Sequence, residues 1–427
     1  MATGTGKTFA ALECLRRSFA KGIDRLAVLS FPYSHLLQQW LEDFAEFNLT
    51  MASVTVDSSN PGWKSELANR LIDLRLGNVK QLAIFTTHDT LGSNELINLV
   101  RTHCTSGFLI VDEVHGIGSP VRRKGLLDLY DARLGLSATP ERWFDPEGTR
   151  VISEYFGGTV YRFSLRQAIA EINPRSGESY LTPYVYNPRF VELSSDEVEK
   201  YVDLSQKISR LYHKTIDAPE YSESYELLLF KRQRILNNAF AKYEMLESIL
   251  SEMGEVSQCL VYCSPQQIEA VQDLLNGRGI IQHKFTMAEG VTPRPEFDGL
   301  SERQFLLKEF ADGTISALVA MKCLDEGVDI PPARTGILLA STGNPREFIQ
   351  RRGRLLRRYP GKERAIIYDI LTIPPVSALP TDEQLLSLER QILQKETTRF
   401  LEFAKDAWNS VECLGVLHEY EARIGLA

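Results

Sequence analysis

The chain has 427 residues, of which 43% are hydrophobic and 24% charged, a composition typical of globular proteins with two or three domains. No apolar run approaches the ~20 residues of a membrane span, so we expect no membrane association and a cytoplasmic location. The net charge of −8 argues against a protein that coats nucleic acid through bulk charge, although it leaves room for a local basic groove. The six scattered cysteines are typical of reduced thiols and not of zinc sites or disulfides.

Residues 1–165 alternate apolar, strand-like runs with amphipathic, helix-like runs, the pattern of a parallel sheet covered on both faces. The predicted strands are 25–31, 51–56, 81–87, 107–113 and 132–139. Helices are predicted over 34–47 and 63–76. We therefore predict one α/β domain that ends near residue 165.

The first eight residues match the end of a phosphate-binding loop, G-x-x-x-x-G-K-[ST], with Met1 where the first glycine is usual. The two glycines allow a tight turn whose N–H groups can surround a phosphate. Lys7 would then reach the β- and γ-phosphates, and the Thr8 hydroxyl would bind Mg²⁺. The predicted cradle is Gly4, Thr5, Gly6, Lys7 and Thr8. The alternative is an ordinary tail rich in glycine and threonine.

The strand over 107–113 ends in two carboxylates and an imidazole, in the order Asp112, Glu113, Val114 and His115. Asp112 is placed to hold Mg²⁺, directly or through water. Glu113 is the natural residue to orient and deprotonate an attacking water. The competing interpretation is a strand with a solvated acidic end. Two hydroxyls, Ser137 and Thr139, follow within the same domain.

Residues 166–250 break the alternation, with prolines first and then two long helices, so we predict a loop-rich helical linker or insertion. The second helix is predicted over 225–250. Alternation resumes in a second α/β domain over 251–373. Its predicted strands are 259–263, 280–281, 315–320, 336–340 and 365–370, with helices over 265–275 and 302–310. The tail, 374–427, is predicted to be helical.

A basic stretch, Gln350 to Arg358, follows a predicted helix start at Asn344. Arg354 and Arg357 are three residues apart, so we expect them to project from one helical face toward the γ-phosphate of a nucleotide. The alternative is a solvated or phosphate-backbone-binding face. We expect that description to fit Arg351 and Arg358.

An acidic turn follows the strand over 315–320 and contains Gly327 and Asp329. Gly327 permits a tight backbone, and Asp329 could hydrogen-bond a ribose or an arginine of the basic stretch. An ordinary acidic turn is the competing interpretation.

Taken together, the motifs at 3–8, 112–115, 137–139, 324–331 and 350–357 occur in the order and spacing of superfamily 2 helicases. The chain resembles the DExH branch, in particular the XPB-like and UvsW-like DNA helicases and translocases. The resemblance covers about residues 1–373. It implies two RecA-like α/β domains with a helical insertion and a helical tail, and hydrolysis of Mg-ATP in the cleft between the domains.

The resemblance also implies roles for individual residues. Catalysis would fall to Glu113, Gln350, Arg354 and Arg357. Ser137 and Thr139 would couple hydrolysis to domain motion, and His115 would link the first domain to the motif around Gln350. Gly327 and Asp329 would bind the nucleotide and couple it to the nucleic-acid groove. Contacts to nucleic acid would fall to Pro32, Tyr33, Thr86, Thr87, Ser264 and Thr342.

DNA is the expected partner more than RNA, because the motif is Asp-Glu-Val-His and not Asp-Glu-Ala-Asp. A nuclease or a repair or defence subunit could act with the motor. Two alternatives stay open: an RNA helicase, and a scaffold or targeting subunit that no longer hydrolyses ATP. Intact Glu113, Arg354 and Arg357 argue against the scaffold.

Related domains have a strand immediately before the phosphate loop and, further upstream, a segment that contacts adenine. In this sequence Met1 stands at that point. We therefore expect an N-terminally incomplete motor that binds ATP weakly and tends to aggregate, and we assign no adenine contact.

Overall fold

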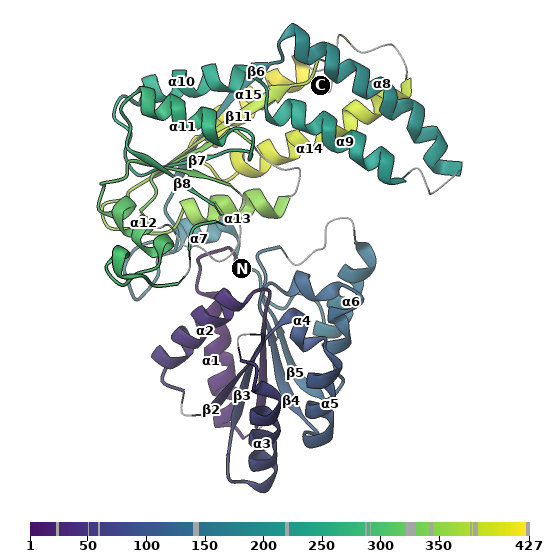
Figure 1. Cartoon of the computed structure of the whole chain (residues 1–427), viewed down its shortest axis with the longest axis vertical. Coiled ribbons are helices and arrows are strands. Elements are labelled where there is room, and N and C mark those ends of the chain that lie inside the picture. Colours follow the sequence, from purple (N-terminus) through teal and green to yellow (C-terminus); the bar gives the residue numbers. More distant parts are fainter. Residues whose placement is uncertain are drawn as a thin grey trace. The chain divides into compact units, whose positions relative to one another are not determined.

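The computed structural model of the chain describes every residue except 23–24, 50, 59, 140–144, 218–221, 287, 291, 322–329, 331, 341–344, 376–377, 379–382 and 424–427. The chain forms two compact units, Met1–Glu171 and Ile172–Ala427. Each unit is built around one parallel sheet with helices packed on it (Figure 1). The predicted α/β class, with two parallel-sheet domains, is confirmed.

The sheet of the first unit has the strand order β2-β3-β1-β4-β5. Its strands are β1 (Leu26–Phe31), β2 (Ala52–Val56), β3 (Leu82–Thr87), β4 (Gly107–Val111) and β5 (Tyr130–Gly135). Every residue of β1 and of β4 is buried, which explains why these strands are continuous apolar runs without alternation. All five predicted strands are present, each shorter than predicted by one or two residues, and β5 also begins two residues earlier than predicted.

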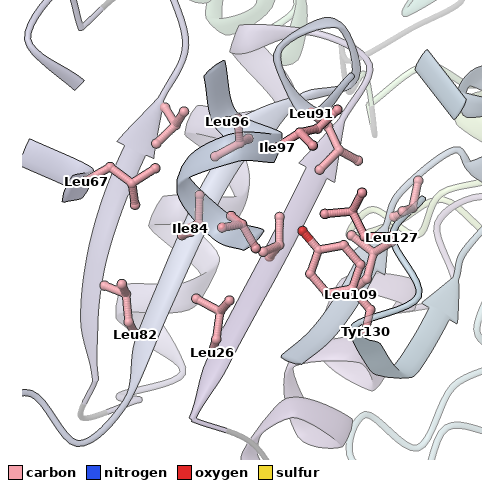
Figure 2. Close-up of a cluster of buried hydrophobic side chains, with 14 of the residues drawn as sticks. Leu26, Leu67, Leu82, Ile84, Leu91, Leu96, Ile97, Leu109, Leu127 and Tyr130 are labelled. Carbon is pink, nitrogen blue, oxygen red and sulfur yellow. The ribbon is translucent and has the colours of Figure 1, made fainter. Parts of the chain in front are cut away.

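Helices cover both faces of this sheet. They are α1 (Lys7–Ala20), α2 (Ser34–Glu46), α3 (Trp63–Leu76), α4 (His88–Leu91), α5 (Asn94–His103), α6 (Pro146–Phe156) and α7 (Leu165–Ala170). Successive residues of a strand point to opposite faces, so Ala27 and Leu29 pack with α1 and α2, whereas Leu26 and Val28 pack with α3 and α5. Figure 2 shows the second of these cores, where Leu67, Leu96 and Ile97 from the helices meet the leucines and isoleucine of the strands.

The sheet of the second unit has the strand order β6-β11-β10-β7-β9-β8. Its strands are β6 (Tyr184–Glu192), β7 (Cys259–Tyr262), β8 (Gln282–Phe285), β9 (Ala317–Ala320), β10 (Thr335–Leu338) and β11 (Ala365–Ile373). The strands predicted near 259, 315, 336 and 365 are confirmed. The strand predicted at 280–281 begins at Gln282 instead.

Residues 166–250 were predicted to form a loop-rich helical connection, but they also contain strand β6. It pairs in parallel with β11 along its whole length, from Tyr184 opposite Ala365 to Glu192 opposite Ile373. The sequence Asn187-Pro188-Arg189 hides this strand because it interrupts the apolar pattern. A proline is tolerated there since β6 lies at the edge of the sheet. The second sheet therefore begins well before residue 251.

The remaining helices belong to the second unit. They are α8 (Ser195–Asp217), α9 (Ser222–Asn237), α10 (Ala241–Met253), α11 (Ile268–Gly277), α12 (Glu302–Ala311), α13 (Pro345–Leu355), α14 (Glu383–Ala404) and α15 (Ser410–Arg423). The single helix predicted over 225–250 is two helices, α9 and α10. None of the described helices is long and apolar enough to cross a bilayer.

The predicted C-terminal tail packs into the core of the second unit. Arg399 of α14 forms a buried ion pair with Asp369 of β11 at 3.2 Å. The Tyr184 hydroxyl donates to the Phe403 carbonyl at 2.5 Å. The Asn409 side chain bonds both the N–H and the C=O of Tyr186, at 3.0 Å each. These contacts make α14 and α15 part of one domain with β6 and β11.

Candidate ATP-binding and hydrolysis site

The phosphate loop has the tight turn that its glycines were predicted to allow. Gly4 and Gly6 have φ values of 81° and 85°, in the left-handed region that residues with a Cβ rarely adopt. The buried Thr5 side chain donates to the Ala2 carbonyl at 2.7 Å. The Ala2 N–H in turn donates to the Phe163 carbonyl at 2.9 Å. The loop is therefore tied both to itself and to the end of the first unit.

Lys7, the first residue of α1, contacts the carboxylate predicted to be catalytic. Its ammonium group lies 3.1 Å from Glu113 Oε1, and the two side chains are only 12% and 19% exposed. These residues are 106 positions apart in the sequence. The fold thus brings the lysine of one motif onto the carboxylate of the other, within a partly water-excluded site.

Asp112 directly follows β4 and is buried. Its Oδ1 accepts from the Glu113 N–H at 2.9 Å, and its Oδ2 accepts from the Trp40 indole N–H at 3.1 Å. Burial raises the pKa of Asp112 to about 6, while the nearby charge of Lys7 opposes that rise. An additional cation beside the Asp112 carboxylate would favour its ionised form.

Glu113 has a backbone conformation that is uncommon for a residue other than glycine. Its φ and ψ are 44° and 53°, in the left-handed region. The turn is closed by the Gly116 N–H, which donates to the Glu113 carbonyl at 2.8 Å. Glu113 immediately precedes the short 3₁₀ turn η1 (Val114–Gly118). Such conformations cluster at functional sites, where the surrounding structure holds them.

The three residues predicted to couple hydrolysis to motion gather around Glu113. His115 Nδ1 lies 3.5 Å from Glu113 Oε2 and 3.4 Å from Ser137 Oγ. The Ser137 hydroxyl also lies 3.5 Å from Glu113 Oε2 and accepts from the Thr139 N–H at 3.0 Å. The segments that carry these side chains follow β4 and β5, which are adjacent strands.

The predicted nucleic-acid contacts of the first unit lie at the same edge of the sheet. Phe31 at the end of β1 is in register with Thr87 at the end of β3, so the loops that follow both strands are neighbours. Tyr33 is 44% exposed, and its ring stacks on His35 with the centroids 5.5 Å apart. Pro32 lies between Phe31 and Tyr33 and is half-buried.

Thr86 and Thr87 differ in what their hydroxyls do. The Thr86 side chain is buried and donates to the Val56 carbonyl at 2.8 Å, so it supports the sheet from inside and offers no hydroxyl at the surface. Thr87 is half-buried at the start of α4, and its hydroxyl accepts from the Thr90 N–H at 3.3 Å. Of the two, Thr87 suits a contact with nucleic acid.

In the second unit, α13 ends at Leu355, so the prediction that Arg354 and Arg357 share a helical face is wrong. Arg354 is buried in the last turn of the helix, next to the buried Gln350 side chain one turn earlier. Arg357 is half-buried in the turn that follows, where its N–H donates to the Arg354 carbonyl at 3.3 Å.

Arg351 and Arg358 are not the solvated residues that the sequence suggested. Arg351 is buried, donates to the Ala340 carbonyl at 3.2 Å and lies over the Tyr262 ring at 5.3 Å. Arg358 donates through Nε to the Ser179 carbonyl at 3.0 Å. Both side chains are thus part of the packing of the second unit.

Ser264 follows β7 and uses its hydroxyl within the protein, at 2.5 Å from Asn238 Oδ1. Its N–H donates to the Gln267 side chain at 3.0 Å. The predicted site residues Gly327, Asp329 and Thr342 lie outside the described residues, as does the predicted helix cap Asn344.

The sequence interpretation missed Trp40 and Arg352. Trp40 lies in the helix predicted over 34–47, and a bond from its indole N–H to a nearby carboxylate could have been sought because a buried tryptophan needs an acceptor. Arg352 lies within the basic stretch, where the sequence indicates no role for it. It forms an ion pair with Glu402 of α14 at 2.8 Å and is 3% exposed.

No group of three or more histidine, cysteine or acidic side chains within the described ranges is arranged to hold a metal ion. An Mg²⁺ ion that binds together with a nucleotide takes only one or two protein ligands and completes its shell with phosphate oxygens and water.

Two family models match the chain. Residues 1–142 match "Type III restriction enzyme, res subunit", and residues 241–359 match "Helicase conserved C-terminal domain". The DNA 3'-5' translocase XPB2 of Sulfurisphaera tokodaii is 29% identical over 283 residues, covering 62% of this chain and 58% of the relative. The putative DNA 3'-5' helicase Rad25 of Halobacterium salinarum is 26% identical over 362 residues, covering 84% and 49%. The chain spans about half the length of the curated relatives it matches.

Two solved structures share the fold. The ATP-dependent Type ISP restriction-modification enzyme LlaBIII bound to DNA matches with a TM-score of 0.57 at 16% identity, over 88% of this chain and 26% of that one. The Pyrococcus furiosus Hef helicase domain matches with a TM-score of 0.52 at 16% identity, over 87% and 91%. With the res-subunit model matched over residues 1–142 and the helicase C-terminal model over 241–359, the chain belongs to the superfamily 2 helicases and is a distant homologue of the XPB and Rad25 DNA 3'-5' helicases and translocases.

Proposed function

We propose that this chain hydrolyses Mg-ATP and uses the energy to translocate along DNA or to separate its strands. The observation that carries the proposal is the contact of Lys7 with Glu113 at 3.1 Å, beside the buried Asp112. A lysine after a glycine turn and an Asp-Glu pair at a strand end have one shared use, which is the binding and hydrolysis of a nucleotide triphosphate.

Mg-ATP fits the residues that surround this contact. The N–H groups of Gly4, Thr5 and Gly6 are available to the phosphates, and Lys7 supplies a positive charge beside them. Thr8 and Asp112 would hold Mg²⁺, which offsets the negative charge on the phosphate oxygens. Burial raises the pKa of Asp112, and a cation beside the carboxylate would offset that rise by favouring the ionised form.

Glu113 acts as the general base in this proposal. Its carboxylate is paired with the ammonium group of Lys7. When phosphates draw the ammonium group away, Glu113 becomes free to orient a water and to accept its proton. Ser137 and His115 lie close to the other carboxylate oxygen and would keep the side chain in place.

The second unit supplies charge to the transition state. Gln350, Arg354 and Arg357 are assigned to the γ-phosphate, where guanidinium groups stabilise the charge that develops during transfer. Asp329 and Gly327 keep their proposed coupling role.

DNA is the proposed track because the relatives' names describe DNA helicases and translocases. Contacts at Pro32, Tyr33, Thr87, Ser264 and Thr342 would be few and local. Since the chain carries a net charge of −8, its affinity should fall with salt along a shallow slope.

The test is ATP turnover with no nucleic acid, single-stranded DNA, duplex DNA and RNA, each over a range of salt. We expect DNA to stimulate turnover more than RNA does. Stimulation by RNA alone would identify an RNA helicase. Turnover that no nucleic acid changes would favour a scaffold or targeting subunit. A strand-displacement assay beside a triplex-displacement assay then separates unwinding from duplex translocation.

A further inference from the structure

Helix α4 is a single turn that connects Thr87 to the interior of the first unit. Its first two residues point in opposite directions: His88 is fully buried, whereas the Asp89 side chain is 70% exposed. Leu91 anchors the turn in the core that Figure 2 shows. A ligand that fixes the position of Thr87 would therefore also fix the positions of His88 and Asp89.

The inner side chain, His88, lies against the turn that carries Glu113. Its Nδ1 is 2.8 Å from Ser30 Oγ, and the Ser30 carbonyl accepts from the Asp112 N–H at 2.9 Å. The ring also packs on Gly116, where an added methyl group would meet the His88 Cδ2 at 3.0 Å. α4 and the Asp112–Gly116 turn are thus in direct contact.

The outer side chain, Asp89, is joined to the same turn through Arg122. Arg122 donates to both carboxylate oxygens of Asp89, at 2.7 and 3.2 Å, and its Nη1 donates to the Gly116 carbonyl at 3.3 Å. The Gly116 N–H is the group that closes the turn on the Glu113 carbonyl. One guanidinium group therefore connects α4 to the backbone of the proposed general base.

The segment that carries Arg122 is itself fitted closely to α4. It forms the 3₁₀ turn η2 (Arg122–Gly125). A methyl group at Gly125 would lie 2.5 Å from the Leu91 carbonyl, and one at Gly92 would lie 2.7 Å from the Val121 carbonyl. Because neither glycine has room for a side chain, the backbones of α4 and η2 are closely packed against each other.

The ion pair itself contributes little to folding. Its side chains are 30% and 70% exposed, and exposed pairs typically stabilise a fold by about 0.2–1 kcal/mol. Its geometry is nevertheless specific, because a planar guanidinium group is bonded to both carboxylate oxygens and to a main-chain carbonyl. The Asp89–Arg122 pair is therefore better suited to fixing the position of the Gly116 main chain than to stabilising the domain.

We propose that Asp89 and Arg122 are positioning residues that transmit nucleic-acid binding at the Thr87 turn to Glu113. The inference rests on the proposed function, in which Thr87 contacts the nucleic acid and Glu113 activates water. Nucleic acid bound at Thr87 fixes α4, α4 fixes Arg122 through Asp89, and Arg122 fixes Gly116 and thereby the Glu113 backbone.

The experiment compares the wild-type chain with Asp89→Asn, Arg122→Gln and the double variant. Arg150→Gln is the matched control, since Arg150 forms comparable exposed ion pairs with Glu147 and Glu154 on α6. For each protein one measures kcat and KM for ATP with and without DNA. One also measures the Kd for DNA with and without a non-hydrolysable ATP analogue, which reports coupling without turnover.

We expect each single variant to lower the stimulation of kcat by DNA by about 5-fold or more, within the range of ordinary coupling energies. Turnover without DNA should stay within about twofold, because neither Asp89 nor Arg122 belongs to the proposed nucleotide site and the exposed pair contributes little to the fold. The double variant should be no worse than the worse single variant, because both changes break one link. The effect of the ATP analogue on the DNA Kd should shrink in the same order.

Three results would overturn the inference: variants with wild-type stimulation, an equal fall in basal and stimulated kcat, or additive effects in the double variant. A wild type that no nucleic acid stimulates would instead contradict the proposed function, and this outcome is visible before any variant is made.

Discussion

In the first unit the charged side chains of the candidate site contact one another, as Lys7 and Glu113 do across 106 positions of sequence. In the second unit three described arginines on and after α13 contact main-chain carbonyls or the C-terminal helices. Arg351 bonds the Ala340 carbonyl, Arg352 bonds Glu402, and Arg358 bonds the Ser179 carbonyl. Within one run of arginines, some residues can therefore be assigned to catalysis while others stabilise the packing of the domain. Activity and stability measured on the same variants separate the two uses.

The largest expected effect is on the two arginines assigned to the γ-phosphate. Arg354→Ala and Arg357→Ala should each lower kcat on the order of 10³-fold, the loss expected for a true arginine finger. ATP affinity should change much less. Arg278→Gln, an exposed arginine bonded to Ser251, serves as the control. If kcat falls only as far as the folded fraction does, these arginines belong with the packing group.

The second-largest expected effect is on the free energy of unfolding. Arg399→Met should lower the free energy of unfolding by about 3–5 kcal/mol, because it leaves the buried carboxylate of Asp369 without its cation. Urea denaturation followed by far-UV circular dichroism gives this value. The double variant Arg399→Met/Asp369→Asn should recover part of the loss. A change below about 1 kcal/mol in Arg399→Met would mean that α14 is not part of the second core.

Glu113→Gln should lower kcat by on the order of 10²-fold or more, as expected for a lost general base. Binding of ATP and Mg²⁺ should persist, since their proposed contacts are elsewhere. Equilibrium binding of a fluorescent ATP analogue and single-turnover hydrolysis measure the two properties. Wild-type turnover in this variant would remove Glu113 from the chemistry. Glu147→Gln, on the exposed face of α6, is the matched control.

The smallest effect is a pH dependence of stability that comes from His88. Burial lowers the pKa of His88 to about 3, well below the 6.5 of an exposed histidine. Between those values the unfolded chain binds a proton that the folded chain excludes, so stability is present above about pH 6.5 and is lost as the pH falls. The expected slope is about 1.4 kcal/mol per pH unit below pH 6.

Urea titrations at pH 7, 6 and 5 measure this slope, and His88→Gln should remove most of it. An unchanged slope in that variant would assign the acid sensitivity to other groups.

The central strands of the first sheet, β1, β3 and β4, could be predicted from sequence because they are almost entirely buried and mostly apolar. β6 could not, since Asn187 and Pro188 resemble loop residues and only the pairing with β11 makes them part of a strand. The residues around the phosphate loop were identified through spacing alone. Their mutual contacts, such as Ser137 with Glu113, depend on which strands become neighbours in the sheet.

The arginines of the basic stretch show the same limit of prediction from sequence. A basic run predicts positive charge, yet the ring of Tyr262 under Arg351 and the carboxylate of Glu402 beside Arg352 are tertiary contacts. Helix length was the second obstacle. α13 ends at Leu355, and nothing in the local sequence separates Arg354, inside the helix, from Arg357, outside it.

Glu113 occupies a backbone conformation that glycine or asparagine would adopt with less strain, and such strain costs about 1–3 kcal/mol. If thermal stability were the only property under selection, this position would be among the first to lose its carboxylate. A library at residue 113 that is screened for melting temperature, without regard to turnover, should therefore enrich glycine. The same library screened for ATP-dependent movement should return glutamate. Stability-guided redesign of this protein must hold residue 113 fixed.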